Sequence, residues 1–401
     1  MNELSSLGLI LLLALGAGHL VKYVRLPEVT GYILAGIVLG PSMLGWVSVQ
    51  NLAALEILSE VALGLILFSV GTVFEASRFR RVGRQVLSLT LYESALAALL
   101  VTAGMLWLGV SWQASFLLGA IAIATAPAST LMVIREVDSE GPLTDSLLAI
   151  IALNNIYCII AFSLVGAAID LASTLGGSTG LMTTLYAALY PLVWQLVGSV
   201  ALGFLVGLLL ARWASAISET GETLILLGGS ILFCVGVARV LELSPLIASM
   251  AVGATMVNLS QRSQPLFTTL SEADPPFYAI FFVLAGAVLD LSLVGSLGLA
   301  GGVYLVGRAV GKLLGARFGA RRLGMAPSVQ RYLGLTLMAQ AGLAVGLTFV
   351  AEHRFPELSR AVTTIVLASV AVYEMFGPVT TRWALIRSGE SRFQRPDEIA
   401  I

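Results

Sequence analysis

Charge and reactive side chains are scarce in this sequence of 401 residues. Lys, Arg, Asp and Glu together make up 11% of the chain, against roughly 25% in soluble domains. The two cysteines, Cys158 and Cys234, lie in apolar runs. Neither has a second Cys or His at metal-ligand spacing, which excludes a disulfide scaffold and a thiolate metal site. The 22 basic and 23 acidic residues nearly cancel, so no basic field points to nucleic acid.

Enzyme signatures are missing as well. The chain has only two histidines, and no cluster of metal ligands or nucleophile with its base can be found in it. We therefore predict neither an enzyme nor a bound cofactor.

Long hydrophobic runs fill the chain instead. Hydrophobic residues make up 58%, and a helix needs about 20 mostly apolar residues to cross a bilayer. We predict an all-α polytopic membrane protein in which each run is one transmembrane helix. The runs, about thirteen in all, are 5–24, 28–47, 52–74, 85–109, 112–134, 143–170, 181–211, 221–241, 244–260, 275–293, 296–316, 328–351 and 358–384.

The order of these runs suggests two repeats. The long run at 181–211 has equal numbers of runs on either side, and a glycine-rich connector at 175–180 precedes it. This layout is typical of inverted-repeat transporters, whose substrate site lies near the membrane midplane between broken helices. We predict one transporter domain over 1–401. Its parts are a first repeat at about 5–170, a linking helix at about 181–211, a second repeat at about 221–384 and a short cytoplasmic tail at 385–401.

The basic residues predict an orientation. Loops on the cytoplasmic side carry an excess of Lys and Arg, and most of the 22 basic residues lie on that side if the N-terminus is outside. We predict a cell (inner) membrane protein with the N-terminus outside and the C-terminus in the cytoplasm.

Polar residues interrupt two runs of the first half. The run 112–134 contains Thr125, Ala126, Pro127 and Ser129 near its middle. Proline removes a backbone donor, which predicts either an ordinary kink or an unwound segment that exposes backbone to an ion. The run 143–170 contains Asn154 and Asn155, which could face a cavity or join neighbouring helices as amide hydrogen-bond partners.

Charged residues occur deep in other runs. Arg308 lies in mid-span, which marks a functional site with a partner by default, and Lys312 follows one turn later. Gln340 interrupts the run 328–351, and Glu93 and Glu374 are the deepest acids. Because acids are costly at this depth, Glu374 and Glu93 are candidate proton carriers.

Several motifs resemble one family in their order along the chain. RLPEVTGYILAG at 25–36, EVALG from residue 60, GPL at 141–143, FFVLAG at 281–286 and GR at 307–308 are similar to segments of the monovalent cation:proton antiporter superfamily, and GP at 377–378 completes the set. The resemblance implies the sodium/proton antiporter fold, with inverted repeats and two centrally broken helices that cross. It further implies a homodimer in the lipid bilayer, elevator-type movement, and exchange of a monovalent cation (Na+ or K+) for protons.

The sequence departs from this family where the family binds its ion. Asn154 and Asn155 stand where the family has a carboxylate, and Ala126 replaces an aspartate before Pro127. A cation about 6 Å from Arg308 would be repelled by roughly 3 kcal/mol at an effective dielectric near 20. Either another carboxylate, Glu374 first and Glu93 second, restores the charge, or the substrate is an anion or small solute. A non-transporting sensor or regulatory subunit is a third hypothesis.

Overall fold

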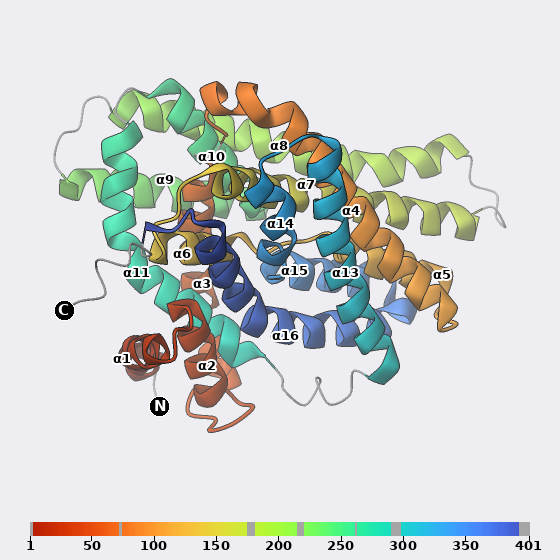
Figure 1. Ribbon diagram of the computed structural model, residues 1–401, viewed down its shortest axis with the longest axis horizontal. Helices are drawn as coiled ribbons and strands as arrows, with labels where there is room; N and C mark the ends of the chain where they lie inside the picture. Colours follow the sequence, from red (N-terminus) through yellow and green to blue (C-terminus); the bar gives the residue numbers. More distant parts are fainter. Residues whose placement is uncertain are drawn as a thin grey trace. The chain divides into compact units, whose positions relative to one another are not determined.

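The computed structural model describes residues 3–71, 74–174, 181–214, 220–260, 263–289 and 298–392. Helices form nearly all of these ranges, and one isolated bridge joins Ser139 to Ser391. The helices (Figure 1) are α1 (Glu3–Tyr23), α2 (Glu28–Leu39), α3 (Val49–Gly71), α4 (Ala76–Trp107), α5 (Trp112–Ile121), α6 (Pro127–Glu136), α7 (Pro142–Thr174), α8 (Leu181–Ala214), α9 (Thr220–Val240), α10 (Pro245–Leu259), α11 (Ser263–Val288), α13 (Gly298–Arg322), α14 (Pro327–Thr336), α15 (Gly342–Arg354) and α16 (Pro356–Ser388).

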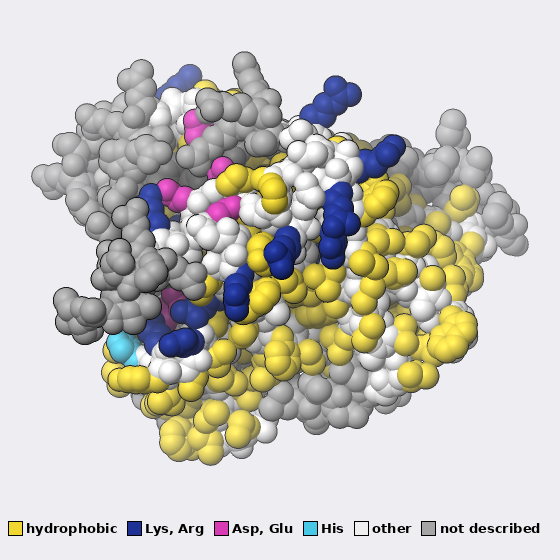
Figure 2. Space-filling view, in the orientation of Figure 1, with side chains coloured by type: hydrophobic (Ala, Val, Ile, Leu, Met, Phe, Trp, Pro, Cys, Tyr) yellow, Lys and Arg dark blue, Asp and Glu magenta, His cyan; other side chains and the backbone are white. Residues whose placement is uncertain are grey.

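The helices have the lengths and composition of a membrane protein. Six described helices are long and apolar enough to cross a bilayer, and shorter apolar helices accompany them. Large hydrophobic side chains such as Leu205, Leu209 and Trp213 of α8 are exposed, and Figure 2 shows broad areas of hydrophobic side chains on the face in view. An apolar surface over a partly polar interior suits lipid as the solvent. The prediction of an all-α polytopic protein is confirmed.

The chain divides into two compact units. Unit 1 comprises Met1–Leu20, Gly31–Gly83 and Val193–Val288. In it α3 packs on α9, α10 and α11. Glycine makes the closest of these contacts possible: a Cβ on Gly71 of α3 would lie 2.1 Å from the carbonyl oxygen of Met250 in α10. Small residues at such positions let membrane helices approach until their backbones touch.

Unit 2 comprises Val21–Thr30, Arg84–Leu192 and Leu289–Ile401. It contains two broken helices. The first is interrupted between Ile121, where α5 ends, and Pro127, where α6 begins. The second is interrupted between Thr336 of α14 and Gly342 of α15. The two breaks meet, because the backbone N–H of Ala126 donates to the carbonyl of Ala339 at 3.0 Å.

These breaks confirm the prediction of two centrally interrupted, crossing helices. Proline explains the first, because it fits position N1 of a helix, where its missing N–H is not needed. The second break contains no proline between 337 and 341, so its cause lies in contacts with other parts of unit 2.

Several predicted boundaries differ from the structure. The run 28–47 is a helix only to Leu39, because a turn begins at Gly40 before Pro41. The run 275–293 starts earlier, since α11 begins at Ser263 and contains Pro275 and Pro276. The helix at the last run is also longer than the run 358–384, because α16 spans Pro356–Ser388. The connector at 175–180 lies outside the described residues.

Candidate ion site

A buried ion pair joins α4 to α13. The Lys312 ammonium lies 2.8 Å from a carboxylate oxygen of Glu93, and both side chains are fully buried. Glycine allows α13 to approach: a Cβ on Gly315 would lie 2.6 Å from the Cα of Glu93, and one on Gly311 would lie 2.4 Å from the Cα of Ala97. The sequence therefore places two glycines where the backbones must touch for the short carboxylate to reach the ammonium.

The same ammonium is anchored in the first break. Lys312 Nζ donates to the carbonyl of Ile123 at 2.7 Å and to Thr125 Oγ1 at 3.2 Å. The Ile123 carbonyl follows the C-terminal end of α5, where partial negative charge accumulates. A buried positive charge there compensates the helix end and the carboxylate together.

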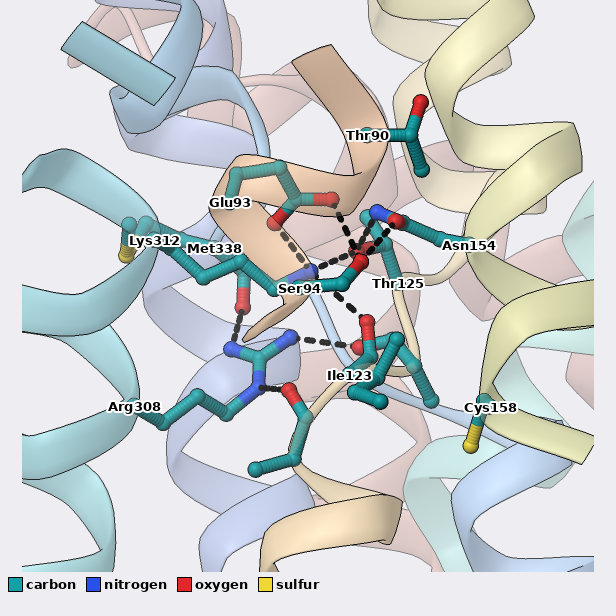
Figure 3. Close-up of polar contacts among 12 residues, drawn as sticks. Thr90, Glu93, Ser94, Ile123, Thr125, Asn154, Cys158, Arg308, Lys312 and Met338 are labelled. Carbon is teal, nitrogen blue, oxygen red and sulfur yellow. Dashed lines mark hydrogen bonds and ion pairs between the residues drawn. The ribbon is translucent and has the colours of Figure 1, made fainter. Parts of the chain in front are cut away.

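Arg308 ties the two breaks to each other. Its guanidinium donates, at 2.7 to 3.3 Å, to carbonyls of both unwound segments, those of Ala122, Ala124, Met338 and Ala339. It also lies 4.3 Å from the centre of the Tyr373 ring. Figure 3 shows the guanidinium between these segments. The partner that the sequence predicted for Arg308 is thus a set of backbone carbonyls, which lowers the repulsion expected for a nearby cation.

Asn154 is linked to the ion pair through hydroxyl groups. Its amide nitrogen donates to Thr125 Oγ1 at 3.0 Å. The Ser94 hydroxyl lies 3.0 Å from the Asn154 carbonyl oxygen and 3.1 Å from a Glu93 oxygen. Glu93, Ser94, Thr125, Asn154 and Lys312 therefore form one connected polar network (Figure 3). Asn154 therefore has the second of the two roles that the sequence allowed, an amide that joins neighbouring helices by hydrogen bonds.

Asn155 has a different environment. Its side chain is 2% exposed, yet neither amide atom has a hydrogen-bond partner among the described residues. Buried amides are normally bonded, so such an atom needs an explanation such as an ion or water. The two adjacent asparagines thus differ: Asn154 is hydrogen-bonded within the network, and the amide of Asn155 makes no hydrogen bond to the described residues.

Glu374 and Ser129 lie together at the contact of α16 with α6. Glu374 is 3% exposed, and its Oε1 has no hydrogen-bond partner within the part of the chain that the structure describes. The Ser129 hydroxyl faces this carboxyl, although no bond of good geometry satisfies it there either. A buried carboxyl and a buried hydroxyl thus lie side by side, and each has an oxygen atom that accepts no hydrogen bond from the described residues.

The other predicted residues at the crossing are Ala126, Pro127 and Gln340, and each has a structural role there. Ala126 is the N-cap of α6 and supplies no side-chain hydrogen bond, while Pro127 starts the helix. Gln340 donates from Nε2 to the carbonyl of Ile121 and to the Tyr304 hydroxyl, both at 3.0 Å. Its carbonyl oxygen has no partner among the described residues.

The structure thus brings part of the predicted site into one network and leaves the rest in other places. Thr125, Asn154 and Glu93 share the network with Lys312. Ser129 lies beside Glu374 instead, and the Asn155 amide makes no hydrogen bond to the described residues. Sequence reasoning missed Ser94. The signal available was its position next to Glu93 in an otherwise apolar run.

A resident metal site is not formed by the described residues. They contain no group of three or more His, Cys, Asp and Glu side chains placed to hold a metal. Cys158 and Cys234 are buried free thiols, and Cys158 donates to the carbonyl of Ala120 at 3.3 Å.

Fold and site together first define a class: a multi-pass helical membrane protein whose two broken helices cross and are tied by buried basic side chains. The chain belongs to the family described as "Sodium/hydrogen exchanger, transmembrane", whose sequence profile matches residues 8–387. This confirms the predicted membership in the monovalent cation:proton antiporter superfamily.

The chain is also similar to individual transporters in sequence and to solved structures in fold. The chain is 26% identical to the iron transporter MagA of Paramagnetospirillum magneticum, over 73% of this chain and 65% of the relative. It is also 26% identical to a glutathione-regulated potassium-efflux system protein of Haemophilus influenzae, over 91% of this chain and 58% of the relative. The chain thus spans roughly three fifths of these relatives. The sodium proton antiporter MjNhaP1 of Methanocaldococcus jannaschii shares the fold, with a TM-score of 0.70, 17% identity and coverage of 96% of both chains.

Proposed function

We propose that the chain is a secondary active transporter that exchanges a monovalent cation, Na+ or K+, for protons at the Glu374 carboxyl. The supporting observation is the contrast between the two carboxyls buried in unit 2. Glu93 has the Lys312 ammonium beside it. Glu374 has no Lys or Arg within ion-pair distance among the described residues, and one of its oxygens is unsatisfied.

Burial gives Glu374 two acceptable forms. A buried carboxylate without a counter-charge is very costly, so the position accommodates either the neutral acid or a carboxylate with a bound cation. Uptake of the cation releases the proton, and return of the proton on the other side of the membrane releases the cation. One proton moves for each monovalent cation, so the cycle is electroneutral.

Neutral oxygens would complete the cation's coordination. Ser129 Oγ faces the carboxyl, and the carbonyl oxygens of Asn155 and Gln340 are likewise buried and unsatisfied in the described structure. The helices α6, α7 and α16 pack on one another, which supports a shared site. Oxygen ligands of this kind suit hard cations.

The charge balance favours a monovalent ion. One carboxylate compensates one positive charge, and the buried Glu93 is already neutralised by Lys312. A divalent ion such as Fe2+, which the name of the relative MagA would suggest, would leave a net charge in the interior. We therefore expect Na+ or K+ to be transported in preference to Fe2+ or Mn2+.

The remaining hypotheses are less well supported. An anion site needs several free donors, whereas the Arg308 guanidinium donates to four carbonyls and the amide nitrogen of Asn155 is a neutral donor without a positive charge. A sensor that does not transport has no observation in its favour.

The division into two units, one of which holds both broken helices, supports elevator-type alternating access by unit 2. A homodimer and a cytoplasmic C-terminus complete the proposal.

The test uses purified protein in liposomes with a trapped pH dye. Gradients of Na+, K+ and Li+, then of Fe2+ and of chloride or bicarbonate, are applied with and without a potassium ionophore. We expect proton movement with Na+ or K+. When K+ is equal on both sides, the ionophore holds the membrane potential near zero, and the rate driven by a Na+ gradient should be unchanged. The rate should be at least about a hundredfold slower in Glu374→Gln, because the exchanging group is gone.

Glu357→Gln is the matched control, because Glu357 is an exposed acid at the start of the same helix. Wild-type rates in Glu374→Gln would refute the assignment of the carboxyl. Proton movement with anions alone would mean that the substrate is an anion and not a cation. No proton movement with any ion would favour the hypothesis of a sensor that does not transport.

A further inference from the structure

The chain folds back after α16 and closes over the loop that precedes α7. Gly389 follows the last helical residue with φ of 78°, a left-handed conformation that glycine adopts at helix ends. Residues 389–392, which we call the clasp, then lie along the loop. Their backbone pairs with it: Glu140 N donates to Glu390 O at 3.0 Å, Arg392 N donates to Asp138 O at 3.3 Å, and Ser139 faces Ser391 in a bridge.

Glu390 caps α7 from this clasp. One carboxylate oxygen accepts the backbone N–H of Leu143 at 2.8 Å. The other accepts both the backbone N–H and the hydroxyl of Thr144, at 2.8 and 2.9 Å. A carboxylate at a helix N-terminus satisfies donors that the helix cannot pair and interacts favourably with its dipole.

The loop is shaped to receive this carboxylate. Gly141, directly before α7, has φ of 153°, and a Cβ on it would lie 2.5 Å from Cδ of Glu390. Glycine at this position offers no side chain for a cap, so α7 uses one supplied from the end of α16. A local Ser or Asp would suffice merely to stabilise a helix end. A cap from another helix makes the start of α7 depend on the position of α16.

That dependence connects the two helices whose residues carry the proposed exchange. α7 carries Asn154 and Asn155, and α16 carries Glu374. We propose that the clasp is a positioning device for transport, with Glu390 as its positioning residue. Closed, it fixes the axial register of α7 against α16; open, it lets the amides and the carboxyl lose their alignment. This role rests on the proposed function, whereas the closure itself does not.

The first experiment measures whether the clasp lies against the loop, by disulfide formation and independently of transport. In the double variant Ser139→Cys/Ser391→Cys the bridge places the two new thiols opposite each other, within reach of a disulfide. We expect rapid oxidation in this background and about tenfold slower oxidation when Glu390→Ala is added, because the cap no longer holds the clasp. Equal oxidation rates would overturn closure by Glu390, whatever ion the chain moves.

The role in exchange is measured in liposomes. Glu390→Ala should lower the maximal exchange rate about tenfold, on the scale that small misplacements of reacting groups cost, and Glu390→Gln should fall between it and the wild type. Oxidising the Ser139→Cys/Ser391→Cys pair in the Glu390→Ala chain should restore the rate, and reduction should remove it again. Glu140→Ala is the control, since the Glu140 side chain makes an exposed pair with Arg392, which is worth little.

Three results would overturn the positioning role. The first is a wild-type exchange rate in Glu390→Ala. The second is a slow rate that the disulfide does not restore in protein that is still monodisperse. The third is loss of exchange when the clasp is locked in a chain that keeps Glu390, because the clasp would then have to open during each cycle.

Discussion

Two contacts in unit 2 each bury one glutamate, and they surround it differently. Where α4 meets α13, Glu93 has the Lys312 ammonium at 2.8 Å and the Ser94 hydroxyl at 3.1 Å. Where α6 meets α16, Glu374 has a neutral hydroxyl, Ser129, in front of it and an oxygen left unsatisfied in the described structure. The first contact therefore holds a fixed charge pair, whereas the second holds a carboxyl that forms no ion pair with any described residue.

Under the proposed function, a cation is bound at Glu374 although asparagine and alanine stand where the resemblance implies carboxylates. Asn154 and Ala126 provide no charge at the crossing, and Arg308 and Lys312 compensate the carbonyls of the breaks. These carbonyls of the two breaks therefore have hydrogen-bond donors from the protein itself and need no bound ion. Exchange can then take place at a carboxyl on a neighbouring helix.

The largest expected effect comes from separating the Glu93–Lys312 pair. Lys312→Met or Glu93→Gln alone leaves one buried charge uncompensated, which costs about 3–5 kcal/mol. The double variant removes both charges and should recover most of this loss, keeping the smaller cost of the hydrogen bonds from Lys312 to Ile123 and Thr125. SDS titration in mixed micelles measures the free energies of unfolding.

Transport by the same variants tests which glutamate exchanges. With Glu374 as the exchanging group, the double variant should still exchange cations for protons. A stable double variant that has lost all exchange would instead assign the proton to the Glu93–Lys312 pair.

A smaller effect is expected from widening the α4–α13 contact. Gly315→Ala places a methyl group 2.6 Å from the Cα of Glu93, so the helices must separate, at a cost of about 1–3 kcal/mol. Gly302→Ala on the same helix meets nothing within 4 Å and should be neutral or slightly stabilising. Thermal unfolding in detergent compares the two, and equal melting temperatures would contradict the close packing described for this pair.

The smallest effect should distinguish the adjacent asparagines. Asn154→Ala removes hydrogen bonds to Ser94 and Thr125, which should cost about 1–2 kcal/mol of stability. Asn155→Ala breaks no hydrogen bond to the described residues and should cost less stability than Asn154→Ala while raising the KM for the cation. If Asn155→Ala leaves the cation KM unchanged, Asn155 is not a ligand.

The sequence was informative wherever a residue type is costly in a membrane. Long apolar runs predict helices, Pro127 predicts the first break, and Arg308 in mid-span predicts a partner, since each violates a strong constraint of the bilayer. The second break shows the limit of such reasoning. Without a proline, it could be predicted only indirectly, from Gln340, from the repeat layout and from the family resemblance, because it depends on Arg308 bonding to Met338 and Ala339.

The sequence by itself determined the class of this protein: continuous apolar runs of about 20 residues indicate membrane-spanning helices, which bond their backbone groups within each segment as the lipid requires. Tertiary structure alone decided which charges pair. Glu93 and Glu374 are alike in the sequence, each a lone acid in an apolar run. They differ because glycines bring α13 close enough to α4 for Lys312 to reach Glu93, while no described basic side chain comes within ion-pair distance of Glu374.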